Sequence, residues 1–451
     1  MKSNRTQDMT VGNPAKLILS FSIPILIGNI FQQLYSMVDT IIVGKCIDTN
    51  ALAAVGATGS MNFLIIGFII GIANGFAVVM AQRFGAKDMD GLRHSIGLSI
   101  LLSIGITILV TAISVACTMP LLKLINTPEE IIQDSYRYIV VIFWGSAATI
   151  LYNLMASLLR AIGDSKTPLY FLIFSSLLNI ILDFAFILLF DMGVAGAAWA
   201  TVISQAISGI LCVIYTFRKY TFLHMQRKDF VWDKGFAWYH LQIGLPMAFQ
   251  FSITAIGGIF LQGALNLFGT ETVAGFTAAM KVENLVTLPA STFGVTMANY
   301  TGQNFGAKQF ERLKEGVRKC TFITLSFSIA ASLILFLFGR PFSLLFLKAT
   351  DTVAMEAAIK YLDISACFFP FLFMIFVYRN VLQGIGKSLM PLLAGFFELI
   401  ARTVVALTLP NLIGYTGVCL AGPFAWIAAS VPLGITYYLV VYPMFKKLKE
   451  M

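Results

Sequence analysis

The chain consists mainly of long apolar stretches joined by short polar segments. A helix rises 1.5 Å per residue, so about 20 apolar residues cross the roughly 30 Å hydrocarbon core of a bilayer. Hydrophobic residues make up 58% of the sequence and charged residues only 12%, about half the charged fraction of an ordinary soluble domain. We therefore predict an all-α integral membrane protein with twelve transmembrane helices, near residues 17–43, 51–82, 94–119, 135–159, 168–190, 193–217, 239–268, 272–301, 317–339, 355–383, 390–412 and 416–442.

Basic residues are distributed unequally between alternate loops. With both termini in the cytoplasm, about 22 Lys and Arg residues fall on the inner side, and the outer loops hold about four, namely Lys45, Lys123, Arg340 and Lys348. This bias predicts a multi-pass protein of the bacterial inner membrane with cytoplasmic termini. The basic residues lie beside apolar spans rather than in a patch with interleaved aromatic residues, so we expect no nucleic-acid partner.

The sequence contains an internal repeat. The segment QRFGAK at 82–87 returns as QNFGAK at 303–308, Pro24 returns as Pro246, and AIGDSKTP at 161–168 returns as GIGKSLMP at 384–391. Each half has six spans, an even number, so the two halves are parallel repeats related by an axis along the membrane normal. We predict an N-terminal lobe at 1–217, a cytoplasmic linker at 218–238 and a C-terminal lobe at 239–451, two pseudo-symmetric six-helix bundles.

Acidic and amide side chains interrupt the first and fifth spans. A carboxylate at membrane depth costs roughly 2.5–3.5 kcal/mol, so it should face a protein interior or a wet cavity. Gln32, Tyr35 and Asp39 share one face of the first helix, and Asn179 lies one turn from Asp183 on the fifth. Both acids fall in the outer halves of helices that run the same way. We therefore expect Asp39 and Asp183 to lie at the same depth.

Two neighbouring carboxyl groups suit an ion-coupling role. A shared proton keeps such a pair from carrying two like charges, and the same oxygens are ligands for a hard cation such as Na⁺. The coupling ion is accordingly H⁺ or Na⁺, with Asp39 and Asp183 as its ligands. A buried polar network without an ion role is the structural alternative.

Several short motifs occur in an order typical of one family. They are Val38-Asp39, Gln-x-x-Gly-Ala after the second and eighth spans, Arg160-Ala-x-Gly-Asp164, Asn179-x-x-x-Asp183 and Gly193-Val-Ala-Gly-Ala197. Over nearly its whole length the chain resembles the MATE multidrug and toxin extrusion transporters. Because its carboxylates lie in the N-terminal half, it looks closest to the DinF-like bacterial branch.

The resemblance implies roles for individual residues. Asp39, Asn179 and Asp183 match coupling positions, and Thr201 matches a neighbouring hydroxyl. Gln32 and Tyr35 match residues that line the substrate cavity, and Pro24 matches a proline where the first helix bends. These roles are expectations that the resemblance carries.

Other polar residues within the spans are candidates for substrate contact or for structure. Asn153, Gln250 and Glu283 could line the cavity, whereas Glu398 and Arg402, four residues apart, are expected to form an internal salt bridge. All three histidines fall in expected cytoplasmic segments and are expected to be solvated, which leaves no histidine relay. Six scattered cysteines predict neither a disulfide framework nor a zinc site.

These features together favour a secondary transporter. GIGKS at 384–388 lacks the first glycine of a phosphate-binding loop, and no HExxH or Ser/His/Asp set is available, so we expect neither an enzyme nor an organic cofactor. We predict a monomeric exporter of amphipathic, cationic drugs or toxins that works in the lipid bilayer by H⁺ or Na⁺ antiport with alternating access. The alternative is a flippase for a lipid-linked or polysaccharide precursor. A membrane-embedded enzyme or scaffold is the third possibility.

Overall fold

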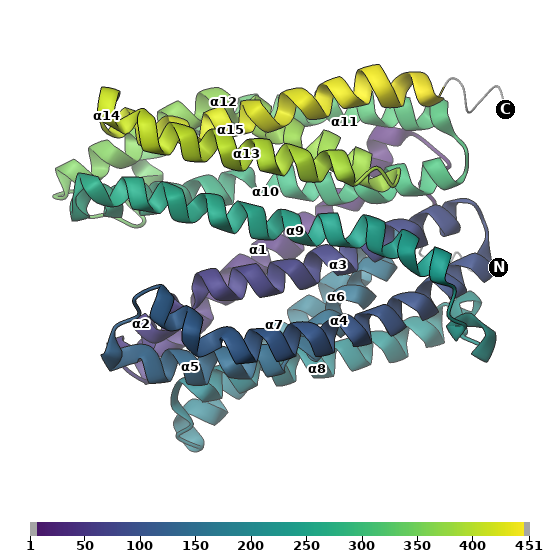
Figure 1. Ribbon diagram of the computed structural model, residues 1–451, viewed down its shortest axis with the longest axis horizontal. Coiled ribbons are helices and arrows are strands. Elements are labelled where there is room, and N and C mark those ends of the chain that lie inside the picture. Colours follow the sequence, from purple (N-terminus) through teal and green to yellow (C-terminus); the bar gives the residue numbers. More distant parts are fainter. Residues whose placement is uncertain (1–6, 446–451) are drawn as a thin grey trace. The chain divides into compact units, whose positions relative to one another are not determined.

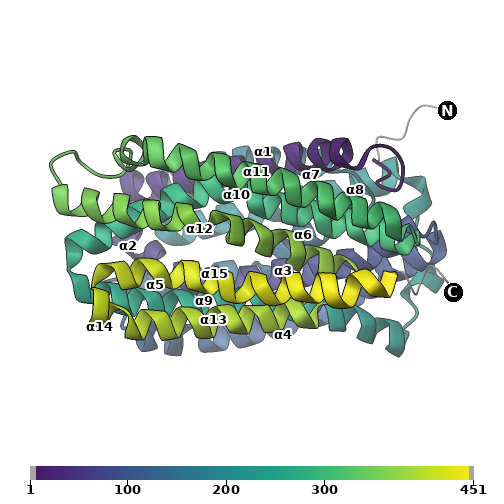
Figure 2. The same ribbon diagram turned by 90° about the horizontal axis from the view of Figure 1, so that it is seen from above.

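A computed structural model describes residues 7–445, and within that range the chain forms helices and no strands (Figure 1 and Figure 2). The helices are α1 (Pro14–Cys46), α2 (Thr49–Ala57), α3 (Gly59–Gly85), α4 (Met89–Leu124), α5 (Glu129–Trp144), α6 (Ser146–Ala161), α7 (Lys166–Phe184), α8 (Gly193–Lys219), α9 (Lys234–Leu265), α10 (Thr270–Gly306), α11 (Phe310–Ser343), α12 (Thr352–Gly384), α13 (Leu389–Thr408), α14 (Pro410–Ile413) and α15 (Tyr415–Ile435). Short π-helical turns extend α7 through Leu189 and α15 through Val441.

The predicted twelve-helix architecture is confirmed. Ten of the described helices are long and apolar enough to cross a membrane, and the bent pair α5 and α6 makes an eleventh span. The twelfth is α10, which has 37 residues, carries Glu271, Lys281 and Glu283, and is not among those ten helices. Polar residues within so long a helix indicate that part of it faces other protein elements.

The fourth predicted span is two helices rather than one. α5 and α6 meet at an angle of 48° at Gly145. A Cβ atom on Gly145 would overlap the side chain of Val202 in α8, so only glycine permits this close approach. The second span is likewise divided at Thr58, between α2 and α3.

The helices group into two compact units. Of the described residues, unit 1 contains Gln7, Asp8 and Ile23–Phe251, and unit 2 contains Met9–Ser22 and 252–445. In unit 1, α6 packs against α3 and α8, and the core includes Phe76, Met155 and Leu159. In unit 2, α10 packs against α12, and α13 lies beside α15, as both views show (Figure 1 and Figure 2).

The first helix of each repeat is shared between the units. α1 passes from unit 2 to unit 1 after Ser22, next to Pro24, and α9 passes from unit 1 to unit 2 after Phe251, just beyond Pro246. Compared with the predicted lobes 1–217 and 239–451, the N-terminal part of α1 belongs to unit 2, and the N-terminal part of α9 belongs to unit 1. A proline inside a helix removes one backbone hydrogen bond. Each helix therefore passes from one unit to the other near a point where its backbone hydrogen bonding is interrupted.

The repeated QxxGA motif secures these exchanged segments. In unit 1, Gln82 Oε1 accepts a hydrogen bond from the Tyr239 hydroxyl at 2.9 Å. In unit 2, Gln303 Oε1 accepts one from the Met9 backbone N–H at 3.0 Å. Each motif thus binds a residue near the start of the other repeat's first helix. The lysine that follows each motif, Lys87 or Lys308, has a φ of 57° in both repeats. The repeat therefore extends to the backbone conformation after the motif.

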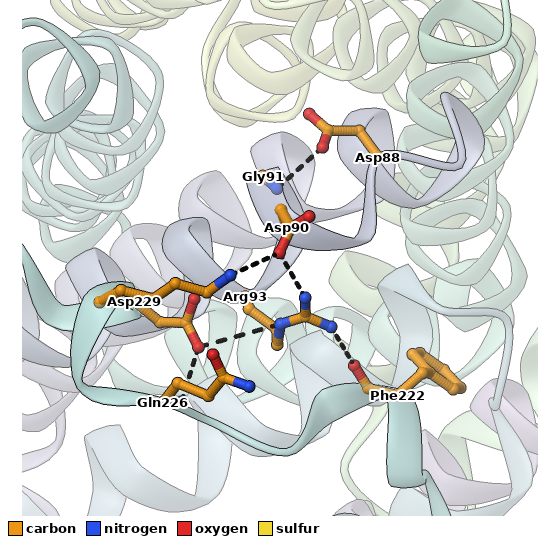
Figure 3. A network of polar contacts seen from close by, with 8 residues as sticks. Asp88, Asp90, Gly91, Arg93, Phe222, Gln226 and Asp229 are labelled. Atoms are coloured by element: carbon orange, nitrogen blue, oxygen red, sulfur yellow. Dashed lines mark hydrogen bonds and ion pairs between the residues drawn. The ribbon is translucent and has the colours of Figure 1, made fainter.

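The predicted linker 218–238 is packed on unit 1. Arg93 of α4 donates to the Phe222 carbonyl at 3.0 Å and to Asp90 at 2.5 Å, and its guanidinium lies 3.9 Å from Asp229 (Figure 3). Asp229 also accepts the Gln226 N–H at 2.7 Å. These contacts fix the connection between the repeats at one end of α4.

The expectation that every histidine is solvated is wrong for His240. Its side chain is fully buried in α9, where Nε2 lies 2.7 Å from Ser95 Oγ and Nδ1 lies 2.8 Å from the Phe236 carbonyl. Phe76 packs edge-on against the ring. The sequence places His240 near the start of a span, but tertiary packing against α3 and α4 decides its burial.

Candidate functional site

The structure brings Asp39 and Asp183 together in unit 1. Asp39 lies on α1 and is partly buried, and Asp183 lies near the end of α7 and is completely buried. Their carboxyl groups are within hydrogen-bonding reach of each other. One oxygen of each group, Oδ1, is buried without a hydrogen-bond partner among the described residues. The pair therefore has unused acceptor capacity in a site that excludes most solvent.

Asn179 and Thr201 form one side of this pair. The Asn179 amide is buried one turn before Asp183 and lies 3.2 Å from Thr201 Oγ1 of α8. With its oxygen toward Thr201, the amide donates to Asp183 Oδ2 at 2.9 Å and accepts the Thr201 N–H at 3.0 Å. Thr201 in turn donates to the Ala197 carbonyl at 3.1 Å. The amide thus links α7 to α8 and holds Asp183 in place.

Two tyrosines complete the surroundings of the pair. The Tyr35 hydroxyl, one turn before Asp39, reaches Thr201 and is close to both carboxyl groups. Tyr138 of α5 is 7% exposed and lies near Tyr35 and the same carboxyl groups. Sequence reasoning missed Tyr138. Tyr138 shares the buried face of α5 with Ser135 and Ile142. A phenol in that position is equally typical of a residue that only packs in the core, so the sequence does not single it out.

The other predicted residues of unit 1 occupy different settings. Gln32 is exposed on α1, and Gln250 is half-buried in α9. The Asn153 amide donates to the Thr149 carbonyl in its own helix at 2.8 Å, and Thr149 donates to Gln205 at 2.7 Å. These contacts orient Asn153 along α6 and join α6 to α8.

Glu283 lies in unit 2 and has its own polar surroundings. It is 8% exposed in α10, and its carboxyl group faces Tyr361 and Ser365, which are one turn apart on α12. Glu283 Oε2 is buried without a hydrogen-bond partner in the described part of the chain. Unit 2 thus holds a buried carboxyl group that the Asp39–Asp183 site does not include.

The expected Glu398–Arg402 salt bridge is present and has a third member. Arg402 Nη2 lies 2.7 Å from Glu398 Oε1, and Arg379 Nη2 of α12 lies 3.1 Å from Glu398 Oε2. All three side chains are 12–14% exposed. Gly257 of α9 makes room for Arg402, since a Cβ there would lie 3.0 Å from its Nη1. One carboxylate therefore joins two guanidinium groups.

The acidic residue of the Arg-Ala-x-Gly-Asp motif has a structural role. Asp164 is 3% exposed and accepts hydrogen bonds from the Thr167 N–H at 2.9 Å, the Thr167 hydroxyl at 2.6 Å, the Tyr220 hydroxyl at 2.5 Å and Lys219 Nζ at 3.0 Å. Burial alone would raise the pKa of this carboxyl group, but the hydrogen bonds from Thr167, Tyr220 and Lys219 hold it below its ordinary value. Asp164 thereby joins the start of α7 to the end of α8.

No group of three His, Cys, Asp or Glu side chains in residues 7–445 is arranged to hold a metal ion. The oxygen atoms gathered around Asp39 and Asp183 come from two carboxyl groups, two phenols, one hydroxyl and one amide. This donor set suits a proton or a hard monovalent cation rather than a transition metal.

Comparisons with known proteins agree on the class of molecule. A family model described as MatE matches residues 24–185 and 246–408, and each match begins at the proline of a repeat's first helix. The chain is 29% identical to "Probable multidrug resistance protein YpnP" of Bacillus subtilis, over 85% of this chain and 86% of that protein. It is 27% identical to "Probable multidrug resistance protein NorM" of Thermotoga maritima, over 95% and 92%.

Solved structures share the fold along the whole chain. A structure described as the outward-facing conformation of a multidrug resistance MATE family transporter has a TM-score of 0.89 and 25% identity, and all of both chains is covered. A transporter from Pyrococcus furiosus, described as having a binding pocket of reversed polarity, has a TM-score of 0.88 and 25% identity, again with full coverage.

Proposed function

This chain belongs to the MatE family, and from that premise we propose that it exports amphipathic, cationic organic compounds in exchange for protons. Several of its relatives are named multidrug resistance or multidrug export proteins, and these are membrane transporters rather than enzymes. The protein is thus a multi-pass multidrug transporter of the membrane. The ion, the substrate class, the cytoplasmic placement of both termini and the monomeric state are parts of the proposal.

The observation that carries the choice of ion is the contact between Asp39 and Asp183. Two ionised carboxylates offer only acceptors, so a hydrogen bond between them requires a proton on one. Asn179 and Tyr35 supply polar neighbours that tolerate either charge state of the pair. This arrangement supports a site that gains and loses a proton, with Na⁺ as the alternative occupant.

The proposed cycle uses that change of charge. A proton from outside binds at Asp39 and Asp183 and neutralises the pair, α1 repacks around Pro24, and the cationic substrate leaves. Exchange of one proton for one singly charged cation moves no net charge, so the pH difference drives the step, at about 1.4 kcal/mol per pH unit. We propose that the substrate contacts five polar side chains within the spans: Gln32, Tyr35, Asn153, Gln250 and Glu283.

Efflux from proteoliposomes under separately imposed pH and Na⁺ gradients tests this function. The pH gradient alone should drive export by the wild type, and Asp39→Asn and Asp183→Asn should each abolish that export while the protein remains folded. Asp191→Asn is the matched control, because Asp191 is exposed just beyond α7. Export driven only by the Na⁺ gradient would show that Na⁺, not the proton, is the coupling ion. Unchanged export by both variants would show that Asp39 and Asp183 do not take part in the mechanism.

One relative suggests a second substrate class. The chain is 24% identical to a protein named "FAD transporter" in Shewanella oneidensis, over 94% of both chains. A planar anion is therefore a candidate beside planar cations. The same vesicle assay, loaded in parallel with a planar dye cation and with FAD, separates the two classes by which compound is exported.

A further inference from the structure

An exposed apolar tripeptide lies in the connection between the two repeats, residues 218–238. Phe230, Val231 and Trp232 are 39%, 59% and 58% exposed, and all three stand outside the long helices. Three consecutive large apolar side chains are unfavourable in water, because their apolar area stays solvated. The tripeptide therefore marks a surface that a partner or a lipid phase covers.

Polar contacts hold the backbone of this tripeptide against α4. Asp229, which precedes it, is buried and lies 3.9 Å from the Arg93 guanidinium (Figure 3). The Val231 carbonyl lies 3.0 Å from Nε2 of His94. A Cβ on Gly97 would overlap the Asp229 carbonyl, so the connection lies directly on the α4 backbone at that point. The exposure of the three apolar side chains is therefore built into the fold.

The neighbouring spans show at which depth the tripeptide lies. On α4, the exposed apolar face begins at Ile104, seven residues beyond Gly97, which corresponds to about 10 Å at 1.5 Å per residue. On α8, the exposed apolar face ends at Tyr215, and Arg218 follows on the same face. Exposed apolar faces of spans contact lipid tails, and a basic residue at the end of such a face lies at headgroup depth. The tripeptide thus lies near the boundary between lipid tails and headgroups.

The same surface carries an excess of positive charge. Three exposed basic residues of the connection have no ion pair with a carboxylate within residues 7–445, namely Arg218, Arg227 and Lys234. The two acids of the connection are already engaged. Asp229 is buried, and Asp233 accepts the Phe236 N–H at 3.0 Å at the start of α9. An anionic partner is therefore complementary to this surface.

An anionic phospholipid matches both the charge and the apolar side chains. Its phosphate accepts charge-assisted hydrogen bonds from guanidinium and ammonium groups. Tryptophan rings favour the level between headgroups and tails, and Trp238, 57% exposed near the start of α9, adds a second ring beside Trp232 in the sequence. A soluble acidic protein would match the charge alone, whereas the depth of the tripeptide places it against lipid.

We propose that the connection binds the headgroup region of anionic phospholipids through a linker surface formed by Arg218, Arg227, Phe230, Val231, Trp232 and Lys234. The apolar side chains enter the boundary region of the bilayer, and the basic side chains bind lipid phosphates. Because α9 begins at Lys234, bound lipid also holds the start of this helix. Lipid binding at the linker surface is independent of the coupling ion and of the exported substrate.

Quenching of tryptophan fluorescence by lipids with brominated acyl chains tests the proposal in full-length protein. Of the five tryptophans, Trp144, Trp199 and Trp238 are exposed and are replaced by Phe, whereas Trp426 is buried and is kept. Trp232 is then the tryptophan that lipid reaches. In nanodiscs, phosphatidylglycerol should associate at Trp232 about fivefold more strongly than phosphatidylcholine, the effect of about one basic residue near the membrane surface.

Charge variants in this background show whether the linker surface selects the lipid. Arg227→Gln combined with Lys234→Gln should lose most of the preference for phosphatidylglycerol, because the phosphate loses two partners. Arg340→Gln combined with Lys348→Gln removes two exposed basic residues elsewhere in the chain and should keep the preference. An equal preference in the two double variants would contradict the proposal.

A second reporter position shows whether the preference is local. A variant that keeps Trp199 of α8 as its exposed tryptophan, with Trp232 replaced by Phe, should be quenched equally by the two brominated lipids. Equal quenching of Trp232 by the two lipids would overturn the selection of anionic headgroups. Quenching of Trp232 by neither lipid would show that water or a soluble partner covers this surface, which would also overturn the proposal.

Discussion

Asp39 of α1 and Asp183 of α7 lie within hydrogen-bonding reach of each other, although each belongs to a different apolar span. The Asn179 amide donates to Asp183 Oδ2 and links it to Thr201 of α8. A pair of acids at membrane depth is costly unless it is neutralised or solvated, so the pair suits the proposed role, in which its charge changes.

Loss of the Asn179 amide should destabilise unit 1. In Asn179→Ala, Asp183 and Thr201 lose a shared partner in a buried setting, which costs about 1–3 kcal/mol. We expect a lower unfolding temperature in detergent than for the wild type. Asn411→Ala, an exposed amide that bonds within its own helical region, is the control. Equal unfolding temperatures for the wild type and Asn179→Ala would show that the amide does not support the site.

The two QxxGA motifs should secure their segments independently. Gln303→Ala removes the acceptor of the Met9 N–H, and Gln82→Ala removes that of the Tyr239 hydroxyl. One hydrogen bond contributes about 1 kcal/mol, so local hydrogen exchange should rise about fivefold. We expect faster exchange near Met9 only in Gln303→Ala and near Tyr239 only in Gln82→Ala. Identical exchange maps for the two variants would contradict the pairing.

Asp164 should make stability depend on pH in acid. Because its pKa is lowered in the folded state, its contribution is complete above the ordinary carboxyl pKa of about 3.9 and is lost as the pH falls through the folded value. Asp164→Asn should therefore unfold at a lower temperature than the wild type at neutral pH. The difference should shrink below about pH 4. An equal difference in unfolding temperature at neutral and acidic pH would show that the charge of Asp164 does not stabilise the fold.

The bend at Gly145 depends on close contact with α8. Gly145→Ala should destabilise the protein by about 1–3 kcal/mol, because its Cβ overlaps Val202. The double variant Gly145→Ala with Val202→Ala should recover part of that loss, since the smaller side chain makes room. Unfolding midpoints of the four proteins of this cycle give the coupling between the two positions. Strict additivity would show that the two side chains do not meet.

Much of this fold follows from sequence patterns. Apolar length predicts the spans, and the recurrence of Pro24 as Pro246 predicts the repeat. The unit boundaries at Ser22 and Phe251 do not follow, because the part of α1 or α9 that packs on each unit depends on tertiary contacts. The bend at Gly145 does not follow either, because it depends on the close approach of Val202 in α8.

The candidate site shows the same division. Asp39, Asn179 and Asp183 stand out because polar groups are expensive in a membrane span. Tyr138 does not stand out, because a tyrosine on a buried helix face is also an ordinary packing residue. Arg379 joins Glu398 from another helix, and such a partner cannot be found from spacing along α13 alone.

Proton release on substrate binding tests the central claim most directly. When a planar dye cation is added to the purified, full-length wild type in weakly buffered detergent solution, a pH indicator should report proton release as the substrate binds. Asp39→Asn and Asp183→Asn should release fewer protons, and Asp191→Asn should match the wild type. Binding by the wild type without proton release, or equal release by all four proteins, would contradict the account.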